Sequence, residues 1–554
     1  MGCPFSKNSQ VLQISESKKD SVTMSDNQDY VEDVVCKNSE VGDDEMKVFD
    51  LRDVGKVLLI RQNGVLSALG ANCTHYGAPL QNGVLGDNRV RCPWHGACFN
   101  ATTGDIEDFP GLDSLPCYQV KLEGDDVKVR ALVAELKSNK RQKRMVKKFP
   151  NSNEHFVIIG GGPSGAMCAE TLRQEGFQGK ITMFTKEKYL PYDRVKLSKA
   201  MNVEINSIQL RGGDFYSDYD IDVLREKEIN KIDLEHKKIT ATDDTTVNFD
   251  RVYIATGSSP RKVNIPGGEL KNVVVLRSYD DASHINSLLS PEKHVVVLGS
   301  SFIGMEAAAF CLGKVARVTV VSKSAVPFDA VFGNVVGSVI LKLFQEKEGE
   351  FVPNNGLAAC FGNEDNELVE VKLNDGAILK ADICILGIGS TLNTEFLKGS
   401  GISMTSYGAV DVNEYLQTNV PNVFAGGDIA FAPIWSHGNN KGSIGHYGLS
   451  QYHGKIAAMN MMNKGQCLKS IPFFWTMLLG KSFRYCGYGV FDDVVIRGDI
   501  SKLVFAAYYI KNDEVVAMCA CGMDPIVSKY AEYVAQGNKL YRKDLEKDPL
   551  DWTK

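Results

Sequence analysis

Two pairs of metal-ligating side chains constrain this chain more than any other feature of its sequence. Cys73 and His75 stand two positions apart, and after sixteen intervening residues Cys92 and His95 stand three apart. Zinc often binds two cysteines and two histidines, but zinc fingers place the cysteines together and the histidines together. A [2Fe–2S] cluster can instead take two cysteines on one iron and two histidines on the other. The mixed pairs therefore predict two loops that clamp a cluster, and a structural zinc site is the alternative.

Glycine-rich flanks accompany both pairs. Gly77 and Gly96 follow the histidines and allow each loop to turn tightly, so that backbone N–H groups can approach the cluster sulfurs. With these flanks, about 100 residues of the chain resemble the Rieske ferredoxin family. The resemblance implies that the two cysteines ligate one iron and the two histidines the other. Cys98 and Cys117, which lie nearby, are expected to be buried structural thiols.

The stretch departs from high-potential Rieske proteins at four positions. Those proteins link their ligand loops by a further disulfide, where this chain has Ala78 and Trp94. They also hydrogen-bond the cluster through a serine and a tyrosine, where this chain has Ala97 and Phe99. Because hydrogen bonds to the cluster and its ligands tune its potential, their absence predicts a low-potential, ferredoxin-like cluster.

A glycine-rich turn follows an apolar, strand-like segment at residues 156–159. Gly160, Gly162 and Gly165 form the pattern G-x-G-x-x-G, with Ser164 inside it. Such a turn opens a helix whose N-terminus binds the pyrophosphate of a dinucleotide. The pattern is weak alone, but a second copy about 140 residues later strengthens it.

The second turn follows the apolar segment 294–298 and begins at Gly299. Ser301 replaces its middle glycine and adds a side chain where the backbone should approach the pyrophosphate, while Ile303 and Gly304 complete the turn. The next apolar segment ends at Lys323, where NAD-preferring enzymes place an acid on the ribose 2′-hydroxyl. A lysine there tolerates a 2′-phosphate, so we expect an NAD(P)H site that leans toward NADPH.

Two connecting motifs resemble the two-dinucleotide flavoproteins, a family that includes ferredoxin reductases and glutathione-reductase-like enzymes. Residues 252–257 read Val-Tyr-Ile-Ala-Thr-Gly, and residues 423–428 read Val-Phe-Ala-Gly-Gly-Asp. The resemblance assigns FAD to the first turn and NAD(P)H to the second. The further FAD contacts that it implies are Ala255, Thr256, Gly257 and Asp428. A disulfide reductase is excluded, because the sequence contains no Cys-x-x-x-x-Cys pair.

The segment 190–199 resembles ferredoxin reductases and the apoptosis-inducing factor family. The resemblance implies that Arg194 and Lys199 contact FAD, and that Glu306 pairs with Lys199 opposite the flavin. We therefore expect Lys199 and Glu306 at the catalytic centre. The alternative is that Glu306 is an early-helix acid favoured by the helix dipole. The acid usually found after the first flavin-domain strand is displaced here to Glu187.

These motifs predict a multi-domain fold: a small all-β Rieske domain, two Rossmann-like α/β dinucleotide-binding domains and a C-terminal α+β domain of the reductase or dimerisation type. A basic segment links the Rieske domain to the first Rossmann-like domain. We expect this linker to be solvated and to let the Rieske domain move; contact with anionic lipid is the alternative. The predicted boundaries are a tail at 1–30, the Rieske domain at 31–136, the linker at 137–154, the FAD domain at 155–285 and 406–464, the NAD(P) domain at 286–405 and the C-terminal domain at 465–554.

The N-terminus fits the pattern for acylation. Gly2 is a candidate for myristoylation and Cys3 for palmitoylation, and two acyl chains anchor a protein stably where one does not. An ordinary flexible terminus is the alternative. We expect a cytoplasmic protein that attaches to membranes when acylated, and the family resemblance adds association with mitochondria. The net charge of −6 argues against a nucleic-acid partner.

Nearly the whole chain resembles the Rieske-bearing members of the apoptosis-inducing factor family. The resemblance implies an FAD-dependent NAD(P)H oxidoreductase that passes electrons from NAD(P)H through FAD to its own [2Fe–2S] cluster. From there the electrons reach an outside acceptor, a redox protein or a small molecule, that the sequence does not identify. The alternative is a membrane-associated apoptosis or signalling protein whose cofactors mainly control its conformation.

Overall fold

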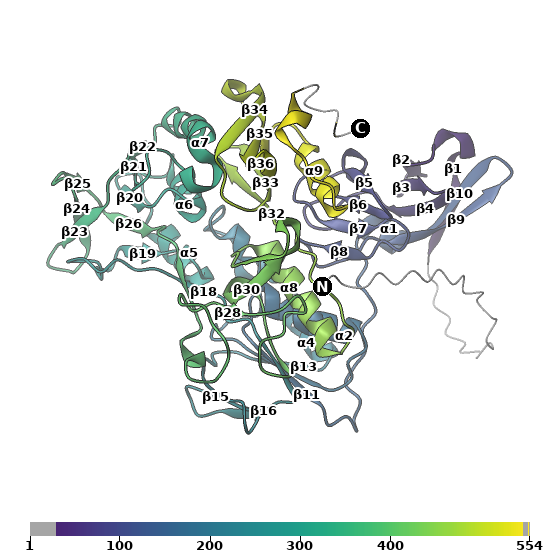
Figure 1. The fold of residues 1–554 in the computed structure, drawn as a ribbon, viewed down its shortest axis with the longest axis horizontal. Coiled ribbons are helices and arrows are strands. Elements are labelled where there is room, and N and C mark those ends of the chain that lie inside the picture. Colours follow the sequence, from purple (N-terminus) through teal and green to yellow (C-terminus); the bar gives the residue numbers. More distant parts are fainter. Residues whose placement is uncertain (1–28, 547–551, 553–554) are drawn as a thin grey trace.

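The computed structural model describes residues 29–546 and Trp552. Gly2 and Cys3 therefore lie outside the described residues, and their acylation stays a prediction. Figure 1 shows four parts, with the all-β first domain beside the C-terminal domain and two α/β domains to the left and below. This arrangement confirms the predicted fold class.

The first domain consists of two antiparallel sheets. The six-stranded sheet has the order β1-β10-β9-β4-β3-β2, and the four-stranded sheet has the order β5-β6-β7-β8. The two predicted ligand loops join β4 to β5 and β6 to β7, so both lie at the smaller sheet. The strands are β1 (Tyr30–Lys37), β2 (Glu45–Leu51), β3 (Gly55–Gln62), β4 (Val65–Gly70), β5 (Val84–Gly86), β6 (Arg89–Arg91), β7 (Cys98–Asn100), β8 (Ile106–Asp108), β9 (Cys117–Glu123) and β10 (Asp126–Leu132).

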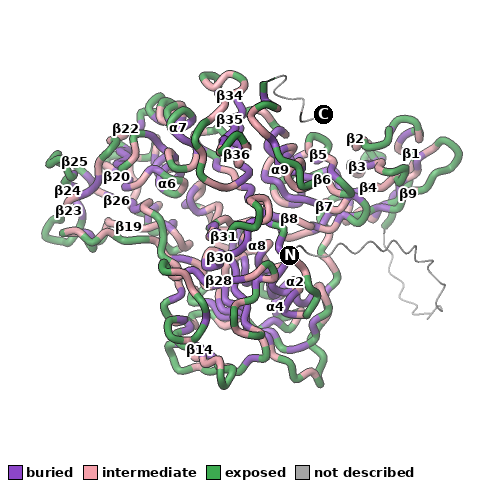
Figure 2. Tube along the Cα trace, viewed as in Figure 1, coloured by how far each residue is buried: buried purple, intermediate pink, exposed green. Residues whose placement is uncertain are grey.

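Strand β3 shows why this domain needs two apolar cores. Residues 57–60 are all buried, although a strand with one solvated face should alternate apolar and polar residues. Val57 and Leu59 pack into one core, while Leu58 and Ile60 pack into another that contains the ligand loops. The strand therefore lies between two layers. Figure 2 shows the same division for the whole molecule, with buried trace inside the domains and exposed trace at the outer loops and hairpins.

The first Rossmann-like domain is built from two separate parts of the chain. Its parallel sheet has the order β13-β12-β11-β17-β29, and the last strand comes from residue 423 onward. Two helices, α2 and α8, pack closely against each other beside this sheet. The elements are β11 (His155–Ile159), α2 (Pro163–Gln174), β12 (Lys180–Phe184), β13 (Ile221–Leu224), β17 (Arg251–Ile254), β29 (Val423–Ala425) and α8 (Tyr447–Met461).

The second Rossmann-like domain repeats this design, and the C-terminal domain does not. The second sheet is parallel in the order β19-β26-β20-β21-β22, whereas the last sheet is antiparallel in the order β32-β33-β36-β35-β34. In the second Rossmann-like domain the elements are β19 (Val273–Val275), α5 (Tyr279–Leu288), β20 (His294–Leu298), α6 (Phe302–Cys311), β21 (Arg317–Val321), α7 (Asp329–Gln345), β22 (Glu350–Val352) and β26 (Ile383–Leu386). In the C-terminal domain they are β32 (Phe473–Leu478), β33 (Lys481–Gly487), β34 (Asp493–Asp499), β35 (Val504–Lys511), β36 (Glu514–Cys521) and α9 (Ile526–Ala535).

The basic segment between the first two domains makes hydrogen bonds to both of them. The backbone of Arg141 pairs with Ser114 in both directions, and its guanidinium binds Asp105 at 2.5 Å. Further along, the N–H of Phe149 donates to the carbonyl of Gln178 in the first Rossmann-like domain. The segment is therefore bound to both domains in this structure, although most of its residues are exposed, as a solvated linker requires; its mobility stays a prediction.

Polar contacts also join the first domain directly to the first Rossmann-like domain. Arg211 forms ion pairs of 2.8 Å with both Asp113 and the buried Glu170. From α8, the Lys455 ammonium donates to two carbonyls of β8 at 3.1 and 3.2 Å, and burial lowers its pKa. Charged groups at a buried interface are stable only when partnered, so these contacts fix one relative position of the two domains.

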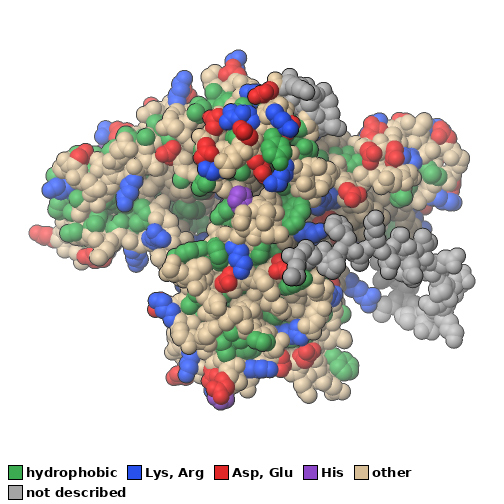
Figure 3. Space-filling view, viewed as in Figure 1, with side chains coloured by type: hydrophobic (Ala, Val, Ile, Leu, Met, Phe, Trp, Pro, Cys, Tyr) green, Lys and Arg blue, Asp and Glu red, His purple; other side chains and the backbone are tan. Residues whose placement is uncertain are grey.

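Charge is distributed unevenly over the surface. In Figure 3, acidic side chains collect at the outer end of the first domain, over β1 and β2. Asp43 and Asp44 directly precede β2, and Glu45 is its first residue. None of the helices within the described residues combines the length and apolar character that crossing a membrane requires.

Candidate cofactor sites

The two predicted ligand loops have the same backbone conformation. In each loop the cysteine N–H donates at 2.8 Å to the carbonyl of the alanine five residues later, Ala78 or Ala97. The residue before that alanine is a glycine in the left-handed region, with φ of 77° at Gly77 and 78° at Gly96. Since a side chain disfavours that region, the two glycines explain how two different sequences make matching turns.

The structure brings the four predicted ligands together as two pairs. The Cys73 and Cys92 thiols are buried and hydrogen-bond each other; that bond and burial raise the pKa of Cys73. The Nδ1 atoms of His75 and His95 lie 3.1 Å apart. Burial lowers the histidine pKa values to about 3 for His75 and about 2 for His95. Both rings are therefore neutral, the form that ligates metals.

This two-plus-two arrangement fits a binuclear cluster better than a single zinc ion. Among the residues that the structure describes, no three His, Cys, Asp or Glu side chains converge as ligands of one ion would. Backbone N–H groups also point at the thiols, those of His75 and Tyr76 at Cys73 and those of Trp94 and His95 at Cys92. Such donors stabilise cluster sulfur, so the residues present fit a [2Fe–2S] centre.

The ligand histidines pack against an aromatic side chain of the C-terminal domain. The ring of Trp475, in β32, lies 4.0 Å from that of His95 and 5.5 Å from that of His75, measured between centroids. The next residue, Thr476, donates to Glu306 at 2.6 Å. The candidate cluster and the candidate catalytic carboxylate are therefore separated by two adjacent residues of one strand.

The Glu306 carboxylate binds three side chains from two separate segments of the chain. The Lys199 ammonium group lies 2.8 Å from the Glu306 carboxylate, and the hydroxyls of Ser198 and Thr476 donate to its two oxygens. Glu306 is only 5% exposed. The expected pairing of Glu306 with Lys199 is present. A helix dipole acting on an exposed acid would require none of these contacts, so the geometry favours a site role for Glu306 over the helix-dipole alternative.

The first glycine turn contains glycines that the fold requires, Gly160 and Gly165, and one that it does not, Gly162. A Cβ on Gly165 would lie 1.9 Å from the carbonyl oxygen of Gly160, which has φ of 123°. A Cβ on Gly162 would meet no atom within 4 Å. Ser164 lies between them but is buried and bonded to the Tyr253 hydroxyl at 2.6 Å. The open space at Gly162 is where a pyrophosphate would approach the backbone.

The second turn is built in the same way. A Cβ on Gly304 would lie 2.1 Å from the carbonyl oxygen of Gly299, and one on Gly299 would lie 2.3 Å from that of Gly387. Ser301 is exposed at the start of α6 and makes no capping hydrogen bond, and Ile303 is 42% exposed. Both side chains therefore face the open side of the turn, where a dinucleotide would bind.

Buried polar atoms without partners identify space for a polar cofactor beside the first turn. Ser443 Oγ, His446 Nδ1 and Tyr447 hydroxyl are buried and have no hydrogen-bond partner within the described structure. The segment adjoins Asp428, because a Cβ on Gly445 would lie 3.7 Å from that carboxyl group. Unsatisfied polar groups are costly in a protein interior, and a bound FAD supplies the acceptors and donors that they lack.

Asp428 and Arg194 already have protein partners. Asp428 accepts from Ser258 at 2.7 Å and from Arg277 at 3.0 Å. Arg194 binds Glu187 at 2.5 Å. The displaced acid Glu187 is thus held by the arginine that the resemblance assigns to FAD. Arg277 lies beside Asp428, which the resemblance also assigns to FAD.

Comparison with known proteins agrees with this architecture. Residues 154–454 match the pyridine nucleotide-disulphide oxidoreductase family, and residues 32–119 match the Rieske [2Fe–2S] domain. Apoptosis-inducing factor 3 of Homo sapiens is 42% identical over 525 residues, which covers 94% of this chain and 86% of the relative. This chain belongs to the apoptosis-inducing factor family, in its Rieske-bearing branch. As a member it uses FAD, a Rieske cluster and NAD(P)H, and it is an FAD-dependent NAD(P)H oxidoreductase.

More distant relatives of this apoptosis-inducing factor family member are separate reductases. The ferredoxin–NAD(+) reductase subunit of the benzene 1,2-dioxygenase system of Pseudomonas putida is 29% identical over 60% of this chain and 80% of its own. A crystal structure of the covalent putidaredoxin reductase–putidaredoxin complex superposes with a TM-score of 0.69 at 23% identity, over 73% of this chain and 98% of the other. The latter likeness shows the fold alone.

At several residues near these sites, the structure differs from what the sequence predicted or adds to it. The expected buried thiol is confirmed at Cys98 and wrong at Cys117, which is exposed and donates to the Thr102 carbonyl at 3.1 Å. Gly387 was missed, although Gly387-Ile388-Gly389 after β26 repeats the position of Ala255-Thr256-Gly257 after β17. Thr256 and Gly257 lie just after the end of β17, and Gly257 has φ of 67°.

The predicted coenzyme-selecting lysine lies on the surface of the second domain. Lys323 is exposed just after β21, and no ion pair to it occurs within the part of the chain that the structure describes. The preceding Ser322 is bonded to Ser300 of the glycine turn at 2.6 Å. The lysine is therefore held close to the turn while its ammonium group stays available to a ligand.

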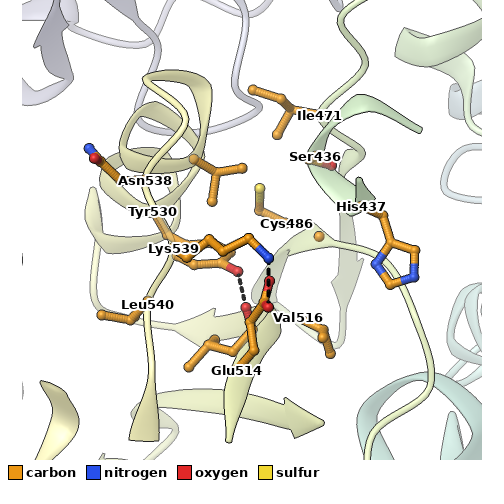
Figure 4. Close-up of a pocket in the computed structure, with 13 residues that line it drawn as sticks. Ser436, His437, Ile471, Cys486, Glu514, Val516, Tyr530, Asn538, Lys539 and Leu540 are labelled. Carbon is orange, nitrogen blue, oxygen red and sulfur yellow. Dashed lines mark hydrogen bonds and ion pairs between the residues drawn. The ribbon is translucent and has the colours of Figure 1, made fainter. Parts of the chain in front are cut away.

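A further pocket lies in the C-terminal domain, away from both glycine turns. Figure 4 shows its lining, where Lys539 and Glu514 form an ion pair of 2.8 Å and the Tyr530 hydroxyl donates to the Val515 carbonyl. The side chains that would bind a ligand are thus paired with each other, and we assign no cofactor to this pocket.

Proposed function

We propose that this chain transfers electrons from NAD(P)H at the second turn, through FAD at the first turn, to its own Rieske cluster. The observation that carries the proposal is the packing of both ligand histidines against Trp475, next to the Thr476–Glu306–Lys199 cluster. When bound, FAD takes two electrons as hydride and releases them singly to a one-electron carrier.

The residues of this chain contribute position and the exclusion of water. Lys199 and Glu306 form an ion pair of 2.8 Å. The pair holds the lysine ammonium group in a fixed position at the expected flavin site. The Trp475 ring covers His95, which is only 7% exposed. Fixed charges in a site without water need no reorganisation during the reaction, and this supports fast transfer between the two cofactors.

Anaerobic reduction of the full-length holoprotein tests the route. We expect NADPH or NADH to bleach the flavin absorbance first and the Rieske absorbance afterwards, within one protein molecule. Cys92→Ser, which removes a predicted cluster ligand, should retain the first step and lose the second. A flavin that is fully reduced while the cluster stays oxidised would overturn the proposed route.

The terminal acceptor lies outside the chain. A redox protein is supported by the relatives, since several of them are reductases of ferredoxin-type partners by name. The test is reduction of an added one-electron protein acceptor by the wild-type chain, compared with Cys92→Ser. Equal rates in the two proteins would mean that electrons leave from the flavin instead.

A role in cell death is the second candidate function, favoured by the 42% identity to an apoptosis-inducing factor. Membrane attachment through acylated Gly2 and Cys3 belongs to the same proposal and rests on the N-terminal pattern alone. Cys92→Ser separates this role from electron transfer, because a purely signalling protein should keep its cellular effect without the cluster. Mass spectrometry of the N-terminal peptide tests the acylation.

A further inference from the structure

Helix α9 of the C-terminal domain is in direct contact with the second ligand loop. Figure 1 shows α9 beside β5 and β6 of the Rieske domain. Ser528 and Glu532 stand four residues apart, which places them on one face of the helix, and both are buried, with 0% and 2% of their surface exposed. Their partners all belong to residues 86–92, which lead into that loop.

Ser528 bonds to a predicted ligand residue itself. Its hydroxyl donates at 2.8 Å to the backbone carbonyl of Cys92, across 436 positions of sequence. Arg484, in β33, donates at 2.8 Å to the carbonyl of Trp94 and is held by Asp524 at 2.9 Å. Two carbonyls of the second loop are therefore bound by side chains of the C-terminal domain.

Glu532 acts on the loop through an arginine. Its carboxylate accepts from Arg89 at 2.6 Å and from Arg91 at 3.1 Å, and Arg91 is 1% exposed. The Arg91 guanidinium in turn donates at 2.9 Å to the carbonyl of Gly96, the residue after His95. Because Arg91 precedes Cys92 and Gly96 follows His95, this bond closes the loop across its two ends.

The fit around Glu532 leaves little freedom. A Cβ on Gly86 would lie 2.3 Å from the Glu532 carboxylate, so β5 packs directly against it. The first ligand loop has different partners: Thr74 donates at 2.6 Å to Asp113 of its own domain, and Tyr76 donates at 2.9 Å to Asp193 of the first Rossmann-like domain. The polar contacts from the C-terminal domain described above thus act on the loop of Cys92 and His95.

We propose that Ser528, Glu532 and Arg484 are positioning residues of the Rieske cluster. They fix the loop that carries Cys92 and His95, so the reductase part of the chain completes the cluster site of the Rieske part. Partners of ligand residues set ligand orientation and thereby the spectrum and potential of a metal centre. The inference concerns how the cluster is held and does not depend on whether electrons reach it from FAD.

The test compares Ser528→Ala and Glu532→Gln with Glu514→Gln in the full-length holoprotein. Glu514 lies in the same domain, where its carboxylate pairs with Lys539 of that domain on the pocket wall of Figure 4. The measurements are iron content, the EPR g-values of the dithionite-reduced cluster and its midpoint potential. Dithionite reduces the cluster without requiring NAD(P)H or the flavin as donor, so the outcome is separate from that of the proposed electron route.

Glu532→Gln should favour the reduced cluster, because it removes the carboxylate that compensates Arg89 and leaves Arg91 with only the more distant Asp108, at 3.5 Å. We expect at least a tenfold change in the reduction equilibrium, about 59 mV for a one-electron couple. Ser528→Ala should shift the g-values with a smaller effect on potential, and it keeps the test valid if Glu532→Gln fails to fold. Glu532→Asp should restore part of the potential, since it retains the charge.

The control variant Glu514→Gln should leave spectrum and potential unchanged. Spectra and potentials in Ser528→Ala and Glu532→Gln that equal those of the control would overturn the proposal. Loss of iron with unaltered g-values in the remaining clusters would also overturn it, because that result would mean that the contacts only stabilise the cluster site and do not set the orientation of its ligands.

Discussion

The glycine at position 162 offers a test of FAD binding that the fold itself does not confound. Gly162 has φ of −82° and ψ of −174°, an extended conformation that alanine adopts without strain. A Cβ there would meet no protein atom within 4 Å. If the pyrophosphate of FAD approaches this backbone, Gly162→Ala should weaken FAD binding and leave the apoprotein folded.

The expected magnitudes follow from these contacts. Alanine restricts the unfolded chain more than glycine does, which stabilises the folded protein by about 0.4–1 kcal/mol. Alanine is also a poorer helix N-cap residue than glycine, which costs about as much folding free energy. The thermal midpoint of the apoprotein should therefore change little. Overpacking a methyl group against a ligand costs about 1–3 kcal/mol, which is about 5- to 150-fold in Kd. The assay is a fluorescence titration of deflavinated protein with FAD, alongside thermal melts.

The neighbouring glycine is the matched contrast. A Cβ on Gly165 would lie 1.9 Å from a backbone oxygen, so Gly165→Ala should lower the melting temperature of the apoprotein as well as its affinity for FAD. An unchanged FAD affinity in Gly162→Ala, with an unchanged melting temperature, would refute the reasoning. It would mean that the open space at Gly162 does not hold the pyrophosphate.

Four further predictions follow. Lys323→Asp should lower the ratio of kcat/KM for NADPH over NADH at least tenfold in steady-state assays, because an acid repels the 2′-phosphate and accepts from a 2′-hydroxyl; an unchanged ratio would remove Lys323 from the site. Trp475→Leu should leave flavin reduction unchanged and slow cluster reduction at least tenfold in rapid-mixing experiments. Arg211→Gln should destabilise the protein by about 3–5 kcal/mol in denaturant melts, because it removes the cation that Asp113 and the buried Glu170 share at the domain interface. Burial lowers the pKa of His453 to about 4, below its unfolded value near 6.5; the folded state then binds fewer protons between these values, so stability should fall as pH drops from 6.5 to 4, and His453→Gln should flatten that slope.

Motifs that act over a few residues could be read from the sequence because their chemistry is local. The turn at Gly160 needs a positive φ, and the loops at Gly77 and Gly96 need the same, so glycine at those places carries its own explanation. The pairing of Lys199 with Glu306 came only from the resemblance, since 107 positions separate them. Nothing in local spacing could have brought the two together.

Contacts between domains could not be predicted, because they depend on surfaces that no periodicity describes. Arg91 and Glu532 are 441 positions apart, and a charged residue in a short strand reads as solvated in sequence. The basic segment shows the same limit. Its lysines and arginines look like those of a free linker, yet Arg141 is fixed by the backbone of Ser114 and the carboxylate of Asp105. Pairing with distant acids, rather than composition, decides the outcome.

The buried charges also bear on why this Rieske domain is docked. Replacing a buried ion pair by apolar residues is often neutral or stabilising, so such pairs are weak evidence for stability. Their geometric demands are strict, however, because a shifted Arg91 would lose its partner Glu532 in an interior of low polarity and leave that carboxylate with Arg89 alone. Arg211 imposes the same demand on a different domain pair. Two such contacts at separate places exclude sliding and rotation, and the position they select is the one in which His95 meets Trp475. The charges at the interface therefore act mainly on the orientation of the cluster toward the flavin site.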